Sequence, residues 1–134
     1  MAESIPLRLG GINQSGAGFT PPVAEAEIDG PWHRQVADLN TYARYRVIVG
    51  VYARGIDNCD VNIEYSTDNV TWADLNATAG QGEVTIDATG LRVGAWVNIA
   101  AAAKAKGIYL RAVVKDGDGV EPVALLSIVV QLQL

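Results

Sequence analysis

Apolar and polar residues alternate in short blocks along the second half of the chain. Residues 45–53, YRVIVGVYA, are apolar on both faces, which predicts a central strand covered on two sides. In residues 59–66, CDVNIEYS, every second residue from Val61 to Tyr65 is apolar and those between them are polar. This alternation predicts a half-buried strand with one face in water.

Further strands are predicted at VTWADL (70–75), EVTIDA (83–88), AWVNIA (95–100), IYLRAVVK (108–115) and PVALLSIVVQLQL (122–134). The polar stretches STDN and DGDG supply turn chemistry between them. Residues 100–107, AAAAKAKG, are the only good helical signal, and they span about two turns. Short strands separated by Gly, Asn and Asp turns predict an all-β fold, an antiparallel jelly-roll-like sandwich with at most one short helix.

The hairpin over residues 60–75 could hold a ligand or serve only to hold the sheet together. Its Trp72 is expected to cap the sheet face that carries Val61, Ile63 and Tyr65. Packing then accounts for every residue of the hairpin, whereas a ligand role would require an exposed aromatic ring.

Residues 1–35 carry four of the five prolines and have no sustained period. They predict an extended N-terminal arm with one short strand near residues 23–28, followed by a β-sandwich domain over residues 36–134. Two alternatives account for the apolar residues of the arm. It packs over its own domain, or it reaches across a neighbouring subunit.

The composition indicates one globular domain, since 49% of the 134 residues are hydrophobic and 19% are charged. The net charge is −5, with only three lysines, and no basic cluster is present. Nucleic acid and anionic membranes are therefore not expected as partners. The N-terminus has no pattern of a secretory signal, so synthesis in the cytoplasm is expected.

No residue pattern for catalysis is present, so we expect a protein that is not an enzyme and has no cofactor. His33 is the only histidine and has no partner at motif spacing. Cys59, the only cysteine, lies among acidic residues and is expected to be buried and structural. A glycosidase would need two carboxylates across a cleft, but most of the carboxylates occupy turns or polar strand positions: Glu64, Asp68, Asp74, Glu83 and Asp87.

A calcium site is left open. Residues 116–119, DGDG, do not continue into an EF-hand loop and are explained as a hairpin turn. Oxygen ligands from this turn, or from Asp57 and Asp60, could still form a calcium site of another kind.

Residues 42–134 resemble small jelly-roll domains of the galactose-binding type. The resemblance rests on YRVIVGVYA, VNIEYSTDNVTWADL, GIYLRAVVKDG and LLSIVVQL. It implies a fold but no ligand, because that scaffold carries many unrelated roles. No binding loop is matched, and no binding residue is carried over.

The organisation of the whole chain is similar to that of the decoration, or cement, proteins of tailed-phage capsids. The resemblance implies a structural protein at the capsid surface of a virion, a homotrimer that binds the major capsid protein. Removal of residues 1–20 should then leave the sandwich folded and weaken assembly. The resemblance implies that partners bind the apolar residues of the arm: Ile5, Leu7, Leu9, Phe19 and Trp32.

Two other functions are left as alternatives. One is a carbohydrate-binding or adhesion module, in which an exposed Trp72, Trp96 or Tyr109 would stack on sugar rings. The other is a phage tail or baseplate component, which the sequence does not separate from a capsid component.

Overall fold

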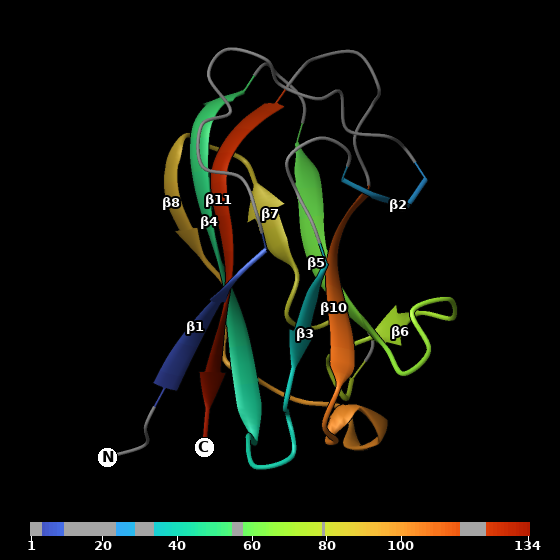
Figure 1. Cartoon of the computed structure of the whole chain (residues 1–134). Helices are drawn as coiled ribbons and strands as arrows, with labels where there is room; N and C mark the ends of the chain where they lie inside the picture. Colours follow the sequence, from blue (N-terminus) through green and yellow to red (C-terminus); the bar gives the residue numbers. More distant parts are fainter. Residues whose placement is uncertain (1–3, 10–23, 29–33, 55–57, 79, 116–122) are drawn as a thin grey trace.

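The structure is a computed structural model that describes residues 4–9, 24–28, 34–54, 58–78, 80–115 and 123–134. The described chain is an antiparallel β-sandwich, as predicted (Figure 1). The five-stranded sheet has the order β1 (Ser4–Arg8), β11 (Val123–Gln133), β4 (Arg44–Arg54) and β8 (Gly90–Val93), and β9 (Val97–Asn98) also pairs with β4. The six-stranded sheet has the order β2 (Ala26–Glu27), β10 (Ile108–Lys115), β5 (Cys59–Ser66) and β6 (Ala73–Asp74), with β3 (Gln35–Ala37) on β10 and β7 (Val84–Ile86) on β5.

Two long strand pairs form the centre of the sandwich. β4 pairs with β11 in one sheet, and the next strand, β5, pairs with β10 in the other. The chain therefore changes sheet at both of these junctions, β4 to β5 and β10 to β11, as it also does between β7 and β8 and between β9 and β10. This antiparallel pairing of strands far apart in the sequence agrees with the predicted jelly-roll-like arrangement.

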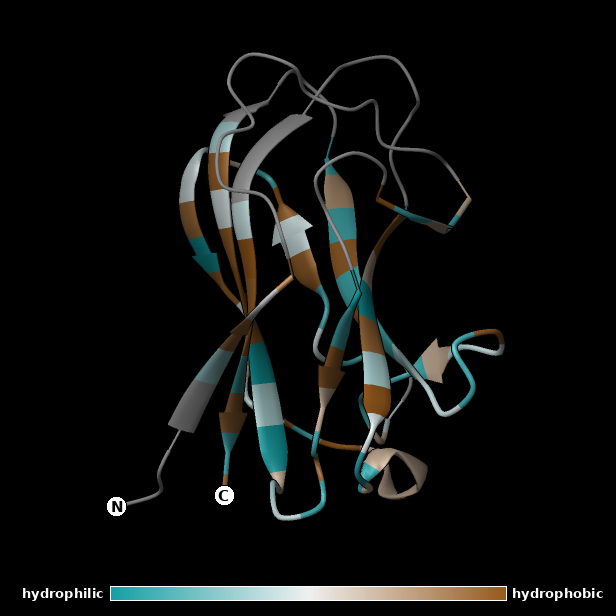
Figure 2. Cartoon of the chain, in the orientation of Figure 1, coloured by the Kyte–Doolittle hydropathy of each residue, from teal (hydrophilic) through white to brown (hydrophobic). Residues whose placement is uncertain are grey.

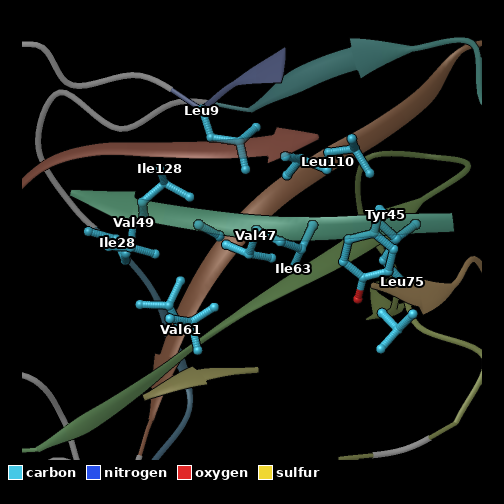
Figure 3. Close-up of a cluster of buried hydrophobic side chains, with 14 of the residues drawn as sticks. Leu9, Ile28, Tyr45, Val47, Val49, Val61, Ile63, Leu75, Leu110 and Ile128 are labelled. Carbon is cyan, nitrogen blue, oxygen red and sulfur yellow. The ribbon is translucent and has the colours of Figure 1, made fainter. Parts of the chain in front are cut away.

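The core lies between the two sheets and consists of the inner rows of the long strands (Figure 3). On one side Val47 of β4 is paired with Val130 of β11, and on the other Ile63 of β5 is paired with Ala112 of β10. Each of these side chains is buried. The alternation in the sequence thus correctly predicted that Val61 and Ile63 of β5 face inward.

The outer row of β4 departs from the prediction of a strand covered on both sides. Ile48 is only half-buried, and Tyr52 is 59% exposed. Among the described elements, none lies over this side of the five-stranded sheet. An apolar run therefore indicated burial on two faces where the structure buries one.

The expected two-turn helix over residues 100–107 is replaced by a single 3-10 turn, η1 (Ala101–Ala103). Tertiary hydrogen bonds hold the backbone here in place of helical ones. Ala100 donates its N–H to the Leu75 carbonyl at 2.7 Å, and Leu39 donates to the Ala105 carbonyl at 2.9 Å. A segment this short gains little from helix formation alone, so these contacts decide its conformation.

The described parts of residues 1–35 pack against their own sandwich. β1 pairs with β11 along its full length, and β2, inside the predicted 23–28 segment, pairs with β10. Leu9 donates its N–H to the Ile128 carbonyl at 2.9 Å, and only 1% of its surface is exposed. For these residues the packed alternative holds, while the domain boundary after residue 35 stays a prediction.

This packing also argues against the expectation that a chain lacking residues 1–20 remains stably folded. Such a deletion would remove β1 from the edge of β11 and would remove Leu9 from the core. The exposed apolar edge that results should destabilise the sandwich itself.

Replacing Leu9 with alanine should lower the free energy of unfolding by roughly 2–5 kcal/mol, because it removes buried apolar surface and leaves a cavity. Urea unfolding followed by tryptophan fluorescence measures the change. Val70→Ala is the control, since Val70 is 78% exposed on a loop, and it should change stability by less than about 0.5 kcal/mol. A Leu9→Ala protein as stable as the parent would contradict the placement of Leu9 in the core.

Candidate functional site

The outer face of the six-stranded sheet is not the wet face that the sequence predicted. Asn62, Glu64 and Ser66 of β5 point outward, yet all three are buried. Side chains from other segments cover them. Local alternation could not reveal this cover, since the covering residues lie elsewhere in the chain.

An ion-pair network covers the buried carboxylate of Glu64. Arg111 lies directly opposite it on β10, donates Nε–H to Glu64 Oε1 at 2.9 Å, and its Nη2 lies 2.7 Å from the same oxygen. Arg111 also lies 3.5 Å from a carboxylate oxygen of Glu27 on β2. Arg34 donates to both Glu27 oxygens, at 3.0 and 2.8 Å, and these hydrogen bonds lower the pKa of Glu27.

Trp72 belongs to this network and lies on the outer face of the sheet. The guanidinium carbons of Arg34 and Arg111 are 4.7 and 4.4 Å from the centre of its ring. The prediction that Trp72 caps the face of Val61 and Ile63 is therefore wrong, because the opposite sheet covers that face. Two cation–π contacts engage the ring from the outside instead.

The turn at residues 66–71 is built around Asp68. Its carboxylate accepts the backbone N–H groups of Val70 and Thr71, each at 2.8 Å, and the hydroxyl of Ser66 at 2.9 Å. These hydrogen bonds, those from the backbone first, lower the pKa of Asp68 to about 2. Asn69 has a positive φ of 63° and accepts a hydrogen bond from Arg34 at 2.9 Å, which ties the turn to the network.

The structure places some of the other chemical candidates. Cys59 is buried, as expected, with 1% of its surface exposed. Asp74 is directly opposite Glu64 in the β5–β6 pair and accepts a hydrogen bond from Asn62 at 2.9 Å. Glu64 and Asp74 are thus each held by a donor on this covered face.

The proposed calcium ligands are only partly described. Asp60 accepts the Thr85 hydroxyl at 2.7 Å, while Asp57 and residues 116–119 lie outside the described residues, as does His33. In the described segments, no three His, Cys, Asp or Glu side chains are grouped as metal ligands. None of the helices described there is long and apolar enough to cross a membrane.

Of the five predicted partner-binding residues, three fall in the described N-terminal strand and its end. Ile5 is in β1, Leu7 is half-buried against the core, and Leu9 is fully within it. Leu9 therefore has a packing role and offers no surface to a partner. Phe19 and Trp32 lie outside the described residues, and their assignment, like those of Ile5 and Leu7, stays a prediction.

The three aromatic residues suggested for sugar stacking do not form an exposed platform. Trp72, Trp96 and Tyr109 are all half-buried. The guanidinium carbon of Arg46 lies 4.6 Å from the Trp96 ring centre, so Trp96, like Trp72, is engaged by an arginine.

The outer face of the five-stranded sheet carries a surface that the sequence did not reveal. Leu91 and Val93 of β8 are 68% and 50% exposed. Val93 is paired with Ile48, and Ile48 is paired on its other side with Val129 of β11, so that one row crosses three strands. We call this surface the apolar face and define it by five outward-pointing residues: Ile48, Tyr52, Leu91, Val93 and Val129.

Beside the apolar face, the outer side of β4 ends in two arginines, which we call the arginine row. Arg44 donates a hydrogen bond to Gln133, and Arg46 donates one to Gln131 at 2.7 Å. Figure 2 shows this end of β4 as hydrophilic. Both partners on β11 are neutral amides, so they do not compensate the positive charge of Arg44 and Arg46.

Comparison with known proteins relates the chain to others only through its fold. No protein-family model matches the sequence, and no curated protein matches it. Similar solved structures include the CBM36-1 domain of a multidomain xylanase from the hindgut metagenome of Trinervitermes trinervoides, with 7% identity and a TM-score of 0.42 over 96% of each chain.

Two further structures are similar to a comparable degree. Eiger TNF from S. frugiperda has 11% identity and a TM-score of 0.44, over 99% of this chain and 92% of that one. A structure of tobacco necrosis virus has 10% identity and a TM-score of 0.35, over 99% of this chain and 94% of that one. At these values the likenesses concern the β-sandwich alone and carry no argument about function.

Replacing Arg111 with methionine should lower the free energy of unfolding by about 2–4 kcal/mol, because it leaves the Glu64 carboxylate buried without its cation. Arg92→Met is the matched control: its partner Asp87 has a side chain that is 49% exposed, so removing that pair should cost less than about 1 kcal/mol. Chemical unfolding of both variants beside the parent gives the comparison. Equal losses in the two variants would contradict the network described for Glu64.

The lowered pKa of Asp68 predicts a pH dependence with a defined sign. A folded-state pKa of about 2 lies below the ordinary value of 3.8, so the stabilisation is complete above about pH 5 and is lost as the pH falls through 3.8 toward 2. Asp68→Ala should therefore show a smaller loss of stability between pH 4 and 2 than the parent. Unfolding curves at several pH values test this, and identical slopes for the two proteins would refute it.

Proposed function

We propose that the chain is a non-enzymatic structural protein of a virion. In this proposal it is a decoration protein that assembles as a homo-oligomer, a trimer by the resemblance of its organisation to cement proteins, and stabilises the shell by binding the major capsid protein at the capsid surface. The observation that carries the proposal is the apolar face. It is an open sheet surface on which Tyr52, Leu91 and Val93 are exposed.

The chemistry of the apolar face supports contact with further copies of the same chain. Clusters of exposed apolar residues mark interaction surfaces in soluble proteins. The five residues that define the face are uncharged. Because the chain has a net charge of −5, copies repel one another, and an uncharged surface is where that repulsion is weakest.

The backbone of β8 supports the same conclusion. β8 is at the end of the strand order of its sheet, and Gly94, just beyond it, donates its N–H to the Val47 carbonyl of β4 at 2.8 Å. In an antiparallel ladder the bonded positions alternate, so the peptide groups of Leu91 and Val93 point away from β4. A strand edge of this kind, with apolar side chains beside it, favours association.

A decoration protein gains from this arrangement because several weak contacts act together. Subunits that associate through one surface can engage several shell positions at once, which raises the overall affinity without stronger single contacts. The net negative charge then keeps decorated particles soluble and apart.

Light scattering during gel filtration should show an oligomer, and Leu91→Asp should shift it toward the monomer, because a carboxylate would be placed in an apolar contact. Val36→Asp is the control, since Val36 is 58% exposed but lies on β3 of the other sheet. Its mass should remain that of the parent. A parent protein that is monomeric at all accessible concentrations, or equal masses for the two variants, would contradict the proposed assembly.

A further inference from the structure

We infer that the arginine row, Arg44 and Arg46 on the outer face of β4, is a docking site for an acidic protein surface. The partner is expected to present carboxylates on alternate residues of an extended segment. This inference rests on the proposed function and deepens it, because it names the chemistry of the surface that the assembled protein meets.

The geometry of the strand fixes the spacing of the two cations. Arg44 and Arg46 are two positions apart on β4, so both side chains leave the same face of the sheet, about 7 Å apart along the strand. Alternate residues of an extended partner segment have the same spacing. Two carboxylates on such a segment can therefore meet both guanidiniums together.

The charge of the arginine row is not balanced by carboxylates in the described chain. None of the ion pairs there involves Arg44 or Arg46. On the other sheet, by contrast, Arg111 and Lys115 contact the carboxylates of Glu64 and Glu83, at 2.7 and 2.5 Å. Arg111 and Lys115 on one outer face are thus paired with carboxylates, whereas Arg44 and Arg46 on the other contact neutral amides and remain available to a partner.

The contacts of the two arginines orient them without neutralising them. Gln133 and Gln131 each accept one hydrogen bond, which leaves most of the five N–H donors of each guanidinium free for a carboxylate. The Trp96 ring lies against Arg46 and restricts its rotation. Holding a charged side chain in place before binding reduces the entropy lost on association.

The partner class follows from the number and setting of the cations. Polybasic sites for anionic lipid headgroups have about 4–8 lysines or arginines, whereas this row has two in a chain of net charge −5. The row is on a sheet surface and continues along β4 into the apolar face. A protein surface that combines carboxylates with apolar residues fits both the arginine row and the apolar face. Arginine can bind carboxylates through paired hydrogen bonds.

The test uses the full chain and a synthetic peptide of alternating glutamate and threonine, titrated while the Arg Nε–H and Trp96 indole N–H resonances are followed by NMR. The parent should bind with shifts at Arg44, Arg46 and Trp96. The Arg44→Gln/Arg46→Gln double variant should bind about tenfold more weakly, because charge-assisted hydrogen bonds are lost. Arg92→Gln is the control, since Arg92 is already paired with Asp87.

Two further measurements make the result specific. Arg46→Lys keeps the charge but loses the paired donor geometry, so its affinity should lie between those of the parent and the double variant. A peptide of alternating glutamine and threonine should not bind. Peptide affinity equal in the parent and the double variant, no binding at all, or binding only to phosphatidylserine vesicles would each overturn the inference.

The light-scattering mass of the same samples separates this inference from the proposed function. The double variant should keep the mass of the parent, because Arg44 and Arg46 lie outside the apolar face. A monomer that binds the peptide through the arginine row would refute the proposed assembly and support the docking site. An oligomer that does not bind the peptide would refute the docking site alone.

Discussion

Glu64 is a carboxylate on a central strand with a side chain only 8% exposed, and the outer half of the six-stranded sheet is organised around its charge. Arg111 compensates that charge from the opposite position on β10 and also contacts Trp72 and Glu27. Glu27 holds Arg34, which reaches the turn after β5. A buried charge without a partner is costly. The contacts that Arg111, Glu27 and Arg34 make with one another therefore hold their segments against the sheet around Glu64.

Some of the rows of the strands that face the core could be read from the sequence because each obeys a local rule. In β5 the alternate residues Val61 and Ile63 are apolar and buried, as are Ile128, Val130 and Leu132 in the later part of β11, whereas β4, apolar on both faces, did not show which row faces the core. The cover of the outer rows follows no such rule. Trp72 faces outward because the guanidinium groups of Arg34 and Arg111 contact its ring there. Both arginines come from distant parts of the chain. The short segment at Ala101–Ala103 was likewise decided by tertiary hydrogen bonds and not by helix propensity.

The candidate site was harder to predict than the fold because it depends on strand register. β8 is only four residues long, Gly90–Val93, and its two apolar residues do not form a recognisable run. They form a surface only because β8 aligns Val93 with Ile48, and β11 aligns Val129 with Ile48. Arg44 and Arg46 did leave a signal, as alternate cations beside an inward Tyr45, but their neutral partners appear only once β4 and β11 are paired.

The unequal pairing of charges on the two sheets gives the molecule an electrical direction. Among the described residues, Arg44 and Arg46 on one outer side have neutral partners, while the carboxylates of Glu27, Glu64 and Asp74 lie on the other. Such a separation is a dipole across the thickness of the sandwich, and the field of a charged body exerts a torque on it before any contact is made. For the inferred docking of the arginine row, such a field would favour encounters in which that face leads, and salt would weaken this preference by screening it.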